Sequence, residues 1–349
     1  MSMYFFRTIY TFAAMIAVSV AMVLFAGPAW AVVVDCNSGG SIQTELNNGE
    51  TQIDFSGTCN EFVSVFQDGT RITGASPATS IITGGMSING VTRVRIENLT
   101  VDGGSGVFIS DGAAARVNGS TFQAGEFGFI INRNSSARLD GNTIGPASGT
   151  TSSSCAALCV GENSNLRMTN TTVTANASNP AVGGPLILFR NSTATLRGGN
   201  VITNTGTEAA VGIFNHSYLR QDDPTIPDGG TSNGVDTFTG SQRALDVFAM
   251  SQADIRNAVV NGNTRVTLHS LLRIASKNFG SDPNNIVFNG KVKLRQDSGL
   301  RIDSPLVTMN GNIRCKDKTS NAQGEFQGTG KYKNCTDFDG EPSIPGGSF

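Results

Sequence analysis

One sixteen-residue pattern recurs from Met86 onward, and it constrains the fold more than any other feature of this chain. In each copy, apolar residues fall mainly at positions 1, 3, 9, 11 and 16, which gives short strands of period two separated by polar turns. The copies start at Met86, Val107, Phe129, Leu158, Leu186, Val211, Leu245 and Val292. A unit this short cannot bury its own apolar face, so each copy must stack on the next at roughly 4.8 Å per layer. The pattern therefore predicts an all-β chain coiled as a single right-handed parallel β-helix.

Stacking places equal positions of the copies in columns along the axis. Position 3 predicts one buried apolar column: Ile88, Ile109, Ile131, Val160, Leu188, Ile213, Val247 and Leu294. Position 7 predicts a serine ladder at a turn: Thr92, Ala113, Ser135, Ser164, Ser192, Ser217, Ser251 and Ser298. Position 15 predicts an outward column rich in threonine: Thr100, Thr121, Thr143, Thr172, Asn200, Thr225, Val259 and Leu306. After Val260 the pattern is irregular until Val292, and we interpret His269 in that stretch as structural.

The two ends differ from the repeat. Residues 1–31 carry one charge, Arg7, before an apolar run that ends in Ala29-Trp30-Ala31, as in a cleaved signal peptide rather than a membrane anchor. Residues 32–85 are expected to form an N-terminal cap and the first rungs, with a short helix at Ser41–Asn47 plugging the end. Residues 86–314 form the remaining rungs, and residues 315–349 form a C-terminal cap and tail. We expect a secreted or periplasmic protein with no membrane span after cleavage.

The six cysteines are an even number in a chain that is expected to be exported. Their spacing favours three local disulfides, Cys36–Cys59, Cys155–Cys159 and Cys315–Cys335, of which the first and last would staple the open ends of the coil. With only two histidines, no metal site is predicted. No cofactor is expected; calcium is possible, but no cluster of ligands is visible in the sequence.

Position 10 carries arginine in most copies, and it lies between two inward positions, so it must face solvent. The column reads Arg95, Arg116, Arg138, Arg167, Thr195, Arg220, Asp254 and Arg301. One interpretation is a solvated face on which the acids at position 12, Glu97, Asp140, Asp222 and Asp303, neutralise the arginines. The other is a track for a polyanion such as an acidic polysaccharide. Nucleic acid is disfavoured because the net charge is −2 and few aromatic residues accompany the arginines.

Position 4 of three consecutive copies carries an outward aromatic residue, Phe189, Phe214 and Phe248. Long connections flank these copies: 145–157, 174–185, 202–210 and 227–244. All four are predicted to run from position 16 to position 1 and thus to project from one edge. The aromatic residues either pack under these loops or form a platform on which sugar rings stack.

Polar residues near this ladder make a candidate glycan site. The expected substrate-binding residues are Phe189, Phe214, Phe248, Asp246, Glu162, Asn191 and Asn215. The expected catalytic residues of an enzyme are His216, Tyr218 and Arg190. His216 or Tyr218 would exchange a proton at C5 of a uronate while Arg190 neutralises its carboxylate. Alternatively, His216 is structural, because it occupies a turn position that holds asparagine in three other copies.

The rung pattern resembles that of the right-handed parallel β-helix superfamily, which includes pectate lyases, pectin lyases, polygalacturonases and mannuronan epimerases. The chain also resembles exported bacterial proteins of this shape that open with a Gly-Thr-Cys-Asn segment, here at residues 57–60. Its catalytic signatures differ from those of the enzymes. Asp222-Asp223 has no Gly-His-Gly element to accompany it, and His216, Tyr218 and Asp222 only approximate the Tyr, Asp and His of an epimerase.

We therefore expect an exported protein that binds a polysaccharide or cell-surface glycan without turnover, and no nucleic acid. The first alternative is a uronate polysaccharide lyase or epimerase that acts at the central rungs. A second is a structural or adhesive solenoid. Ice binding through the threonine column is disfavoured, because the neighbouring position 13 mixes Asn, Gly, Asp and Ser.

Overall fold

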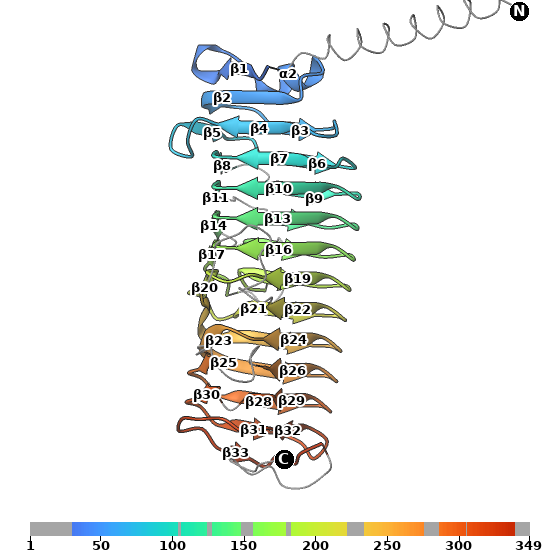
Figure 1. The fold of residues 1–349 in the computed structure, drawn as a ribbon, viewed down its shortest axis with the longest axis vertical. Coiled ribbons are helices and arrows are strands. Elements are labelled where there is room, and N and C mark those ends of the chain that lie inside the picture. The colour runs from blue at the N-terminus through green and yellow to red at the C-terminus, as the bar shows by residue number, and fades with distance from the viewer. Residues whose placement is uncertain are drawn as a thin grey trace, which may run out of the picture.

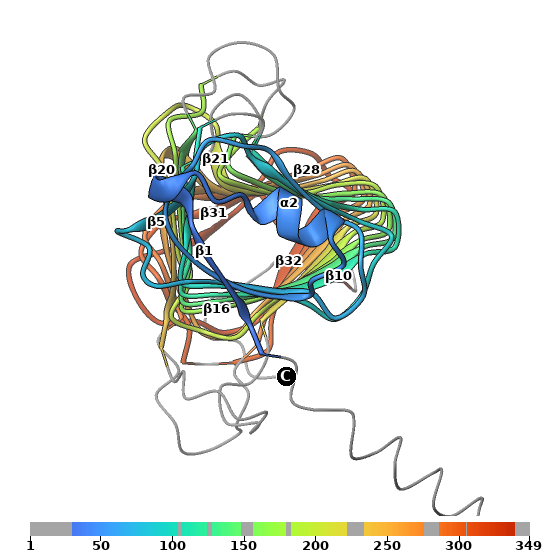
Figure 2. The same cartoon turned by 90° about the horizontal axis from the view of Figure 1, so that it is seen from above.

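The computed structural model describes residues 30–103, 106–123, 128–147, 156–178, 183–221, 234–275, 286–304 and 306–338. In them parallel strands stack into a long coil whose turns follow one another along the axis (Figure 1). Each turn contributes strands to three parallel sheets, which Figure 2 shows end-on. The predicted all-β solenoid is confirmed. Most of the predicted signal peptide lies outside the described residues, and none of the helices within them is long and apolar enough to cross a membrane.

We name each sheet after a residue type that recurs on its outer face. Three strands, β2, β23 and β25, bend around a corner of the coil, and each of them belongs to two sheets. The arginine sheet contains β1 (Val32–Asp35), β2 (Gln52–Cys59), β4 (Arg71–Gly74), β7 (Val94–Glu97), β10 (Ala114–Asn118), β13 (Ser136–Asp140), β16 (Asn165–Thr169), β19 (Thr193–Leu196), β22 (Tyr218–Gln221), β24 (Gln252–Ile255), β26 (Leu271–Ile274), β29 (Gly299–Ile302) and β32 (Asn321–Gln323). The threonine sheet contains the second half of β2, then β5 (Ser80–Ile82), β8 (Thr100–Asp102), β11 (Thr121–Gln123), β14 (Thr143–Ala147), β17 (Thr172–Ala175), β20 (Val201–Asn204), the first halves of β23 (Asp236–Phe248) and β25 (Ala258–Thr267), β27 (Val287–Phe288) and β30 (Thr308–Met309). The phenylalanine sheet contains β3 (Val63–Val65), β6 (Met86–Asn89), β9 (Val107–Ser110), β12 (Phe129–Ile131), β15 (Leu158–Val160), β18 (Leu186–Leu188), β21 (Ala209–Phe214), the second halves of β23 and β25, β28 (Val292–Arg295), β31 (Ile313–Cys315) and β33 (Tyr332–Lys333).

The core consists of columns of apolar side chains that stack along the axis inside the coil. All eight residues predicted at position 3 are fully buried and pair in register from layer to layer. The structure adds a rung that the sequence pattern missed: Val266 pairs with Val247 on one side and with Leu294 on the other. The described residues from 261 to 275 therefore continue the rungs. Their pattern is obscured because polar Thr264 occupies the inward position 1, where it is buried.

Two sequence-based assignments on the threonine sheet are wrong. Thr172 pairs with Val201, Val201 pairs with Thr237, and Val287 pairs with Thr308, so Asn200 and Leu306 are not members of the threonine column. Thr225 lies outside the described residues. One additional residue in the turn after Leu196 shifts the register. The fourth predicted loop, residues 227–244, is wrong as well. Its second half belongs to β23, and the described strand that precedes β23 is β22 of the arginine sheet rather than a strand of the threonine sheet.

The N-terminal end is closed by the predicted helix, α2 (Ile42–Asn47), which lies across the opening of the coil (Figure 2). The side chain of Ser41 caps this helix by accepting from the N–H of Thr44, and Ile42 and Leu46 are fully buried. The Glu61 carboxylate accepts from the N–H of Ile42 at 2.8 Å and from the Ser41 hydroxyl at 2.6 Å. A carboxylate at a helix N-terminus satisfies orphan donors, so this contact holds the cap on the coil.

Disulfides join Cys36 to Cys59, beside the 3-10 turn η1 (Cys36–Ser38), and Cys315 to Cys335, as predicted for both ends. Cys159 is also disulfide-bonded. Its predicted partner, Cys155, lies outside the described residues, so that pairing stays a prediction.

Buried polar ladders hold the corners of the coil. The predicted serine ladder is confirmed: Ser217 donates its N–H to the hydroxyl of Ser251 at 3.2 Å, and Ser251 does the same to Ser270 in the rung that the pattern missed. At the next corner, Asp236 accepts two hydrogen bonds from Asn200, at 3.0 and 2.8 Å, and one from Gln221. Each ladder satisfies backbone groups that would otherwise be buried without partners.

Asp236 makes the stability of this corner depend on pH. Burial raises the pKa of Asp236 from 3.8 to about 6, and the hydrogen bonds from Asn200 and Gln221 offset only part of that rise. Because the folded pKa is above the unfolded value, the native state takes up a proton as the pH falls from about 6 to 4, and the free energy of unfolding rises over that window by up to about 3 kcal/mol. Denaturant unfolding between pH 4 and 7.5 measures this slope. Asp236→Asn should flatten it, and equal slopes for the two proteins would contradict the assignment.

Candidate functional site

The structure brings the three predicted aromatic residues together on the outer face of the phenylalanine sheet. Phe214 and Phe248 pair in register, with ring centroids 6.2 Å apart, and Phe189 and Phe214 pack beside buried Ile187 and Cys159. A Cβ on Gly161 would lie 2.3 Å from Phe189, and one on Gly212 would lie 2.5 Å from Phe214, so the rings rest against glycine. All three rings are half-buried. They are thus neither fully covered by loops nor fully open to solvent.

The polar residues beside this ladder lie on the turn between the phenylalanine and arginine sheets. Arg190 donates to Glu162 at 2.9 Å, and its guanidinium carbon lies 5.8 Å from the centre of the Phe189 ring. Glu162 is also 3.9 Å from Arg133, which in turn contacts Asp111 at 3.3 Å. Arg190 is therefore one end of a chain of alternating charges that runs along the axis, and its charge is already neutralised by Glu162.

His216 occupies a backbone position that selects asparagine in other layers. Asn191, Asn215 and His216 are exposed and have positive φ, and Asn163 and Asn134 adopt the same left-handed conformation in their layers. The backbone N–H of Asn191 donates to the carbonyl of Asn215 at 3.0 Å. Asparagine tolerates this conformation better than most residues. The turn geometry alone thus accounts for the residues at these positions, and a catalytic role of His216 stays a prediction.

Tyr218 and Asp246 lie apart from the exposed turn. Tyr218 is in β22 on the arginine sheet, around the corner from the aromatic ladder, and burial, followed by the charge of Asp254, raises its pKa. The Asp246 side chain is only 3% exposed; it accepts from Arg265 at 2.9 Å and from Arg243 at 3.2 Å, and Arg243 also binds Glu208 at 2.9 Å. Neither residue therefore offers a free basic group on the face that carries the phenylalanines.

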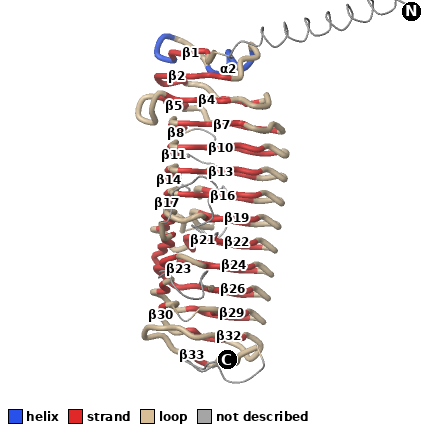
Figure 3. The backbone as a smooth tube through the Cα atoms, in the orientation of Figure 1, coloured by secondary structure: helices blue, strands red, loops and turns tan. Residues whose placement is uncertain are grey.

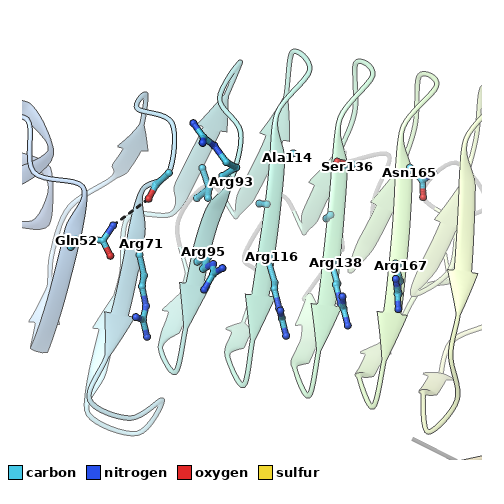
Figure 4. Close-up of a pocket in the computed structure, with 14 residues that line it drawn as sticks. Gln52, Arg71, Arg93, Arg95, Ala114, Arg116, Ser136, Arg138, Asn165 and Arg167 are labelled. Atoms are coloured by element: carbon cyan, nitrogen blue, oxygen red, sulfur yellow. Dashed lines mark hydrogen bonds between the residues drawn. The ribbon is translucent and has the colours of Figure 1, made fainter. Parts of the chain in front are cut away.

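The arginine column is the most regular array of functional groups on the surface. Backbone register aligns five consecutive layers, and Figure 4 shows their side chains extending in the same direction. The five are Arg71, Arg95, Arg116, Arg138 and Arg167. The column continues with Arg220, Arg273 and Arg301, and it is interrupted by Thr195 before Arg220 and by Asp254 after it. The sequence analysis missed Arg71, although Arg71-Ile72 repeats the pair Arg95-Ile96 of the next layer.

Among the ion pairs that the structure describes, the predicted neutralisation by position 12 is seen at the two ends of the column. Glu97 binds Arg71 at 2.8 Å. At the other end, Asp303 binds Arg273 at 2.6 Å and Arg301 at 2.5 Å. Asp222 lies outside the described residues.

In the middle of the column, Arg95, Arg116 and Arg138 have no carboxylate partner among the described residues. Arg95 makes no side-chain hydrogen bond or ion pair there, and Arg116 donates only to the neutral Asn118 amide, at 3.1 Å. The buried Nε of Arg138 has no hydrogen-bond partner. Burial, and then the positive charges of Arg167 and Arg116, lower the pKa of Arg138. The nearby Asp140 only partly opposes this effect, so the charges in these layers repel one another.

A groove of about 740 Å³ runs beside these guanidinium groups (Figure 4). It exists because short side chains, Ala114 and Ser136, take position 8 in the layers of Arg116 and Arg138. Of the described residues that line it, six are arginine and none is Asp or Glu. We call this feature the arginine groove. From the sequence this column is compatible with either a salt-bridged face or a polyanion track, and the candidate site is predicted at the aromatic ladder instead.

Comparison with known proteins supports the architecture alone. Residues 84–244 match the family model described as a right handed beta helix region. No curated protein and no solved structure gave a match. The match covers the layers that contain most of the arginine groove and the aromatic ladder, and the described strands coil in parallel beyond it at both ends, so the chain has the fold of the right-handed parallel β-helix superfamily.

Proposed function

We propose that the arginine groove binds an acidic polysaccharide whose chain runs along the axis of the coil. The observation that carries the proposal is the set of stacked arginines in which Arg95, Arg116 and Arg138 have no carboxylate partner among the described residues. Leaving like charges side by side at roughly 4.8 Å is unfavourable unless an anion neutralises them. A guanidinium group forks onto a carboxylate or sulfate through two parallel hydrogen bonds, so each layer can hold one acidic group.

The shape of the groove favours a polysaccharide over a nucleic acid. Duplex DNA carries a charge every ~1.7 Å along its axis, much closer than the layers of the coil. Single strands are usually held by aromatic side chains on which bases stack. The described residues that line the groove include no aromatic residue, while Ala114 and Ser136 leave room for a bulky, hydroxylated chain.

The proposal is for binding without turnover. Among the described lining residues, none is Asp, Glu, His, Tyr, Cys or Lys, the side chains that most often transfer protons at neutral pH. The lyase or epimerase alternative rests on His216, Tyr218 and Arg190, which lie on different faces or are already paired. No observation favours it over binding.

Removing two arginines from the middle of the groove tests the proposal. Arg116→Gln with Arg138→Gln should weaken binding to polygalacturonate, alginate or heparin by about 10- to 100-fold, because one charge-assisted contact is lost in each of two layers. Neutral dextran should not bind to either protein. Titration calorimetry at two salt concentrations measures the affinity, and rising salt should weaken it.

Arg301→Gln is the matched control, because Arg301 occupies the same column but is held by Asp303. It should leave the affinity nearly unchanged. An equal loss in both variants, or no loss in the double variant, would move the site away from the groove. If the wild-type protein released unsaturated sugars, detected by their ultraviolet absorbance, the statement that it does not turn the polymer over would be wrong.

A further inference from the structure

A second group of cations lies at the C-terminal end of the coil, on the phenylalanine sheet. Lys293, Arg314 and Lys333 pair in register on β28, β31 and β33, so their side chains form one outward column. Arg295 and Lys316 follow two residues after Lys293 and Arg314 and therefore face the same side. These five residues, which we call the basic patch, cover two columns and three layers of the sheet.

The basic patch is not neutralised by the described residues. None of the five makes an ion pair there, whereas Arg265, one layer earlier in the same column, is bound by Asp246. All but the half-buried Lys293 are exposed. The pKa of Lys316 is lowered, first by the positive charge of Arg314 and then by burial. The charges of Arg295 and Lys293 lower it further. Four cations thus act on one another at this end of the molecule.

The basic patch is separate from the arginine groove. The groove lies on β4, β7, β10, β13 and β16, whereas the patch lies on a different sheet at the opposite end of the coil (Figure 1). The net charge of the chain is −2, so an anionic surface would be attracted by this local feature and not by the molecule as a whole.

We propose that the basic patch docks the protein on an anionic lipid bilayer through the phosphates of the headgroups. A patch that is two columns wide and three layers long matches a two-dimensional array of charges better than a single polymer chain. Three of its five residues are lysine, which binds phosphate as a compact point charge on a flexible stem. The same face continues into half-buried aromatic residues: the column of Arg295 runs through Thr267 to Phe248 and Phe214. Clusters of four or more basic residues are attracted to anionic lipid headgroups, and half-buried aromatic rings are amphipathic groups that fit the headgroup level.

Vesicle co-sedimentation tests this docking. The protein should start at residue 30, so that the apolar N-terminal segment cannot itself bind lipid. It should bind vesicles of phosphatidylglycerol and phosphatidylcholine and leave vesicles of phosphatidylcholine alone in the supernatant. The triple variant Lys293→Gln, Arg314→Gln, Lys316→Gln should bind about 100-fold more weakly, because each basic residue near an anionic surface contributes roughly 1 kcal/mol.

The control is the triple variant Arg95→Gln, Arg116→Gln, Arg138→Gln, which removes the same charge from the groove and should keep its affinity for vesicles. Thermal melts should show that both variants are folded. The proposal is overturned if the patch variant sediments as well as wild type, or if both triple variants lose binding equally. It is also overturned if the patch variant loses binding to a soluble acidic polysaccharide while its affinity for vesicles is unchanged. Because vesicle binding and polymer binding are measured separately, failure here leaves the proposed function of the groove standing.

Discussion

Replacing Leu188 by Asp will lower the free energy of unfolding by about 4 kcal/mol or more, because a carboxylate replaces a fully buried apolar side chain. Leu188 stacks between Val160 and Ile213, so its environment in the adjacent layers is apolar on both sides. The buried acid will be protonated more readily than in water, and part of the loss should be recovered at low pH. Denaturant unfolding at pH 7.5 and pH 4.5 measures both effects.

Val201→Asp is the matched control for this experiment. The sixteen-residue pattern assigns Val201 to an inward position, but the structure shows it outward and 39% exposed, with its neighbour Ile202 buried in its place. A substitution at an exposed strand position should change the free energy of unfolding by less than about 1 kcal/mol. A large loss for Val201→Asp with a small loss for Ile202→Asp would show that the register on this sheet is wrong.

Removing either terminal disulfide should cost about 3 kcal/mol, since the closed loops span 23 residues for Cys36–Cys59 and 20 for Cys315–Cys335. The effect should be local. In a stacked solenoid each layer contacts only its neighbours, so the coil frays from whichever end loses its staple. Limited proteolysis of Cys315→Ser with Cys335→Ser should cut first in the last layers, and hydrogen exchange should increase there before it increases at Ile131.

Cys159→Ser provides the comparison, because Cys159 lies in β15 in the middle of the coil, with paired layers on both sides. It should lower stability less than the loss of either terminal pair. If the mid-coil variant were the least stable of the three, the disulfides would not be acting as end staples. Peptide mapping without reductant would also test the predicted Cys155–Cys159 link directly.

The sequence alone determined the architecture, because an alternation of apolar and polar residues decides which side chains face inward whatever layer they belong to. All eight inward residues at position 3, the serine ladder and the capping helix were predictable for this reason. Prediction from the sequence was wrong where a residue departs from the apolar pattern although the strand still stacks in the coil. Thr264 is inward and polar, and the extra residue after Leu196 shifts Val201 outward. In both places, pairing with adjacent layers overrides the local signal.

Only the tertiary structure decided which charges are free. Glu97 reaches back to Arg71 in the preceding layer, so Arg95 of its own strand lacks a carboxylate partner among the described residues, although the two are adjacent in the pattern. Likewise, the ring of Phe189 rests on Gly161, which precedes it by one layer of the coil. Equivalent residues of adjacent layers are more than twenty positions apart in the chain but lie roughly 4.8 Å apart in space. A side chain can therefore pair with a residue of its own layer, of the preceding layer or of the following layer. The order of residues along the chain does not encode that choice, because it depends on the length and rotamer of each side chain in its packed surroundings.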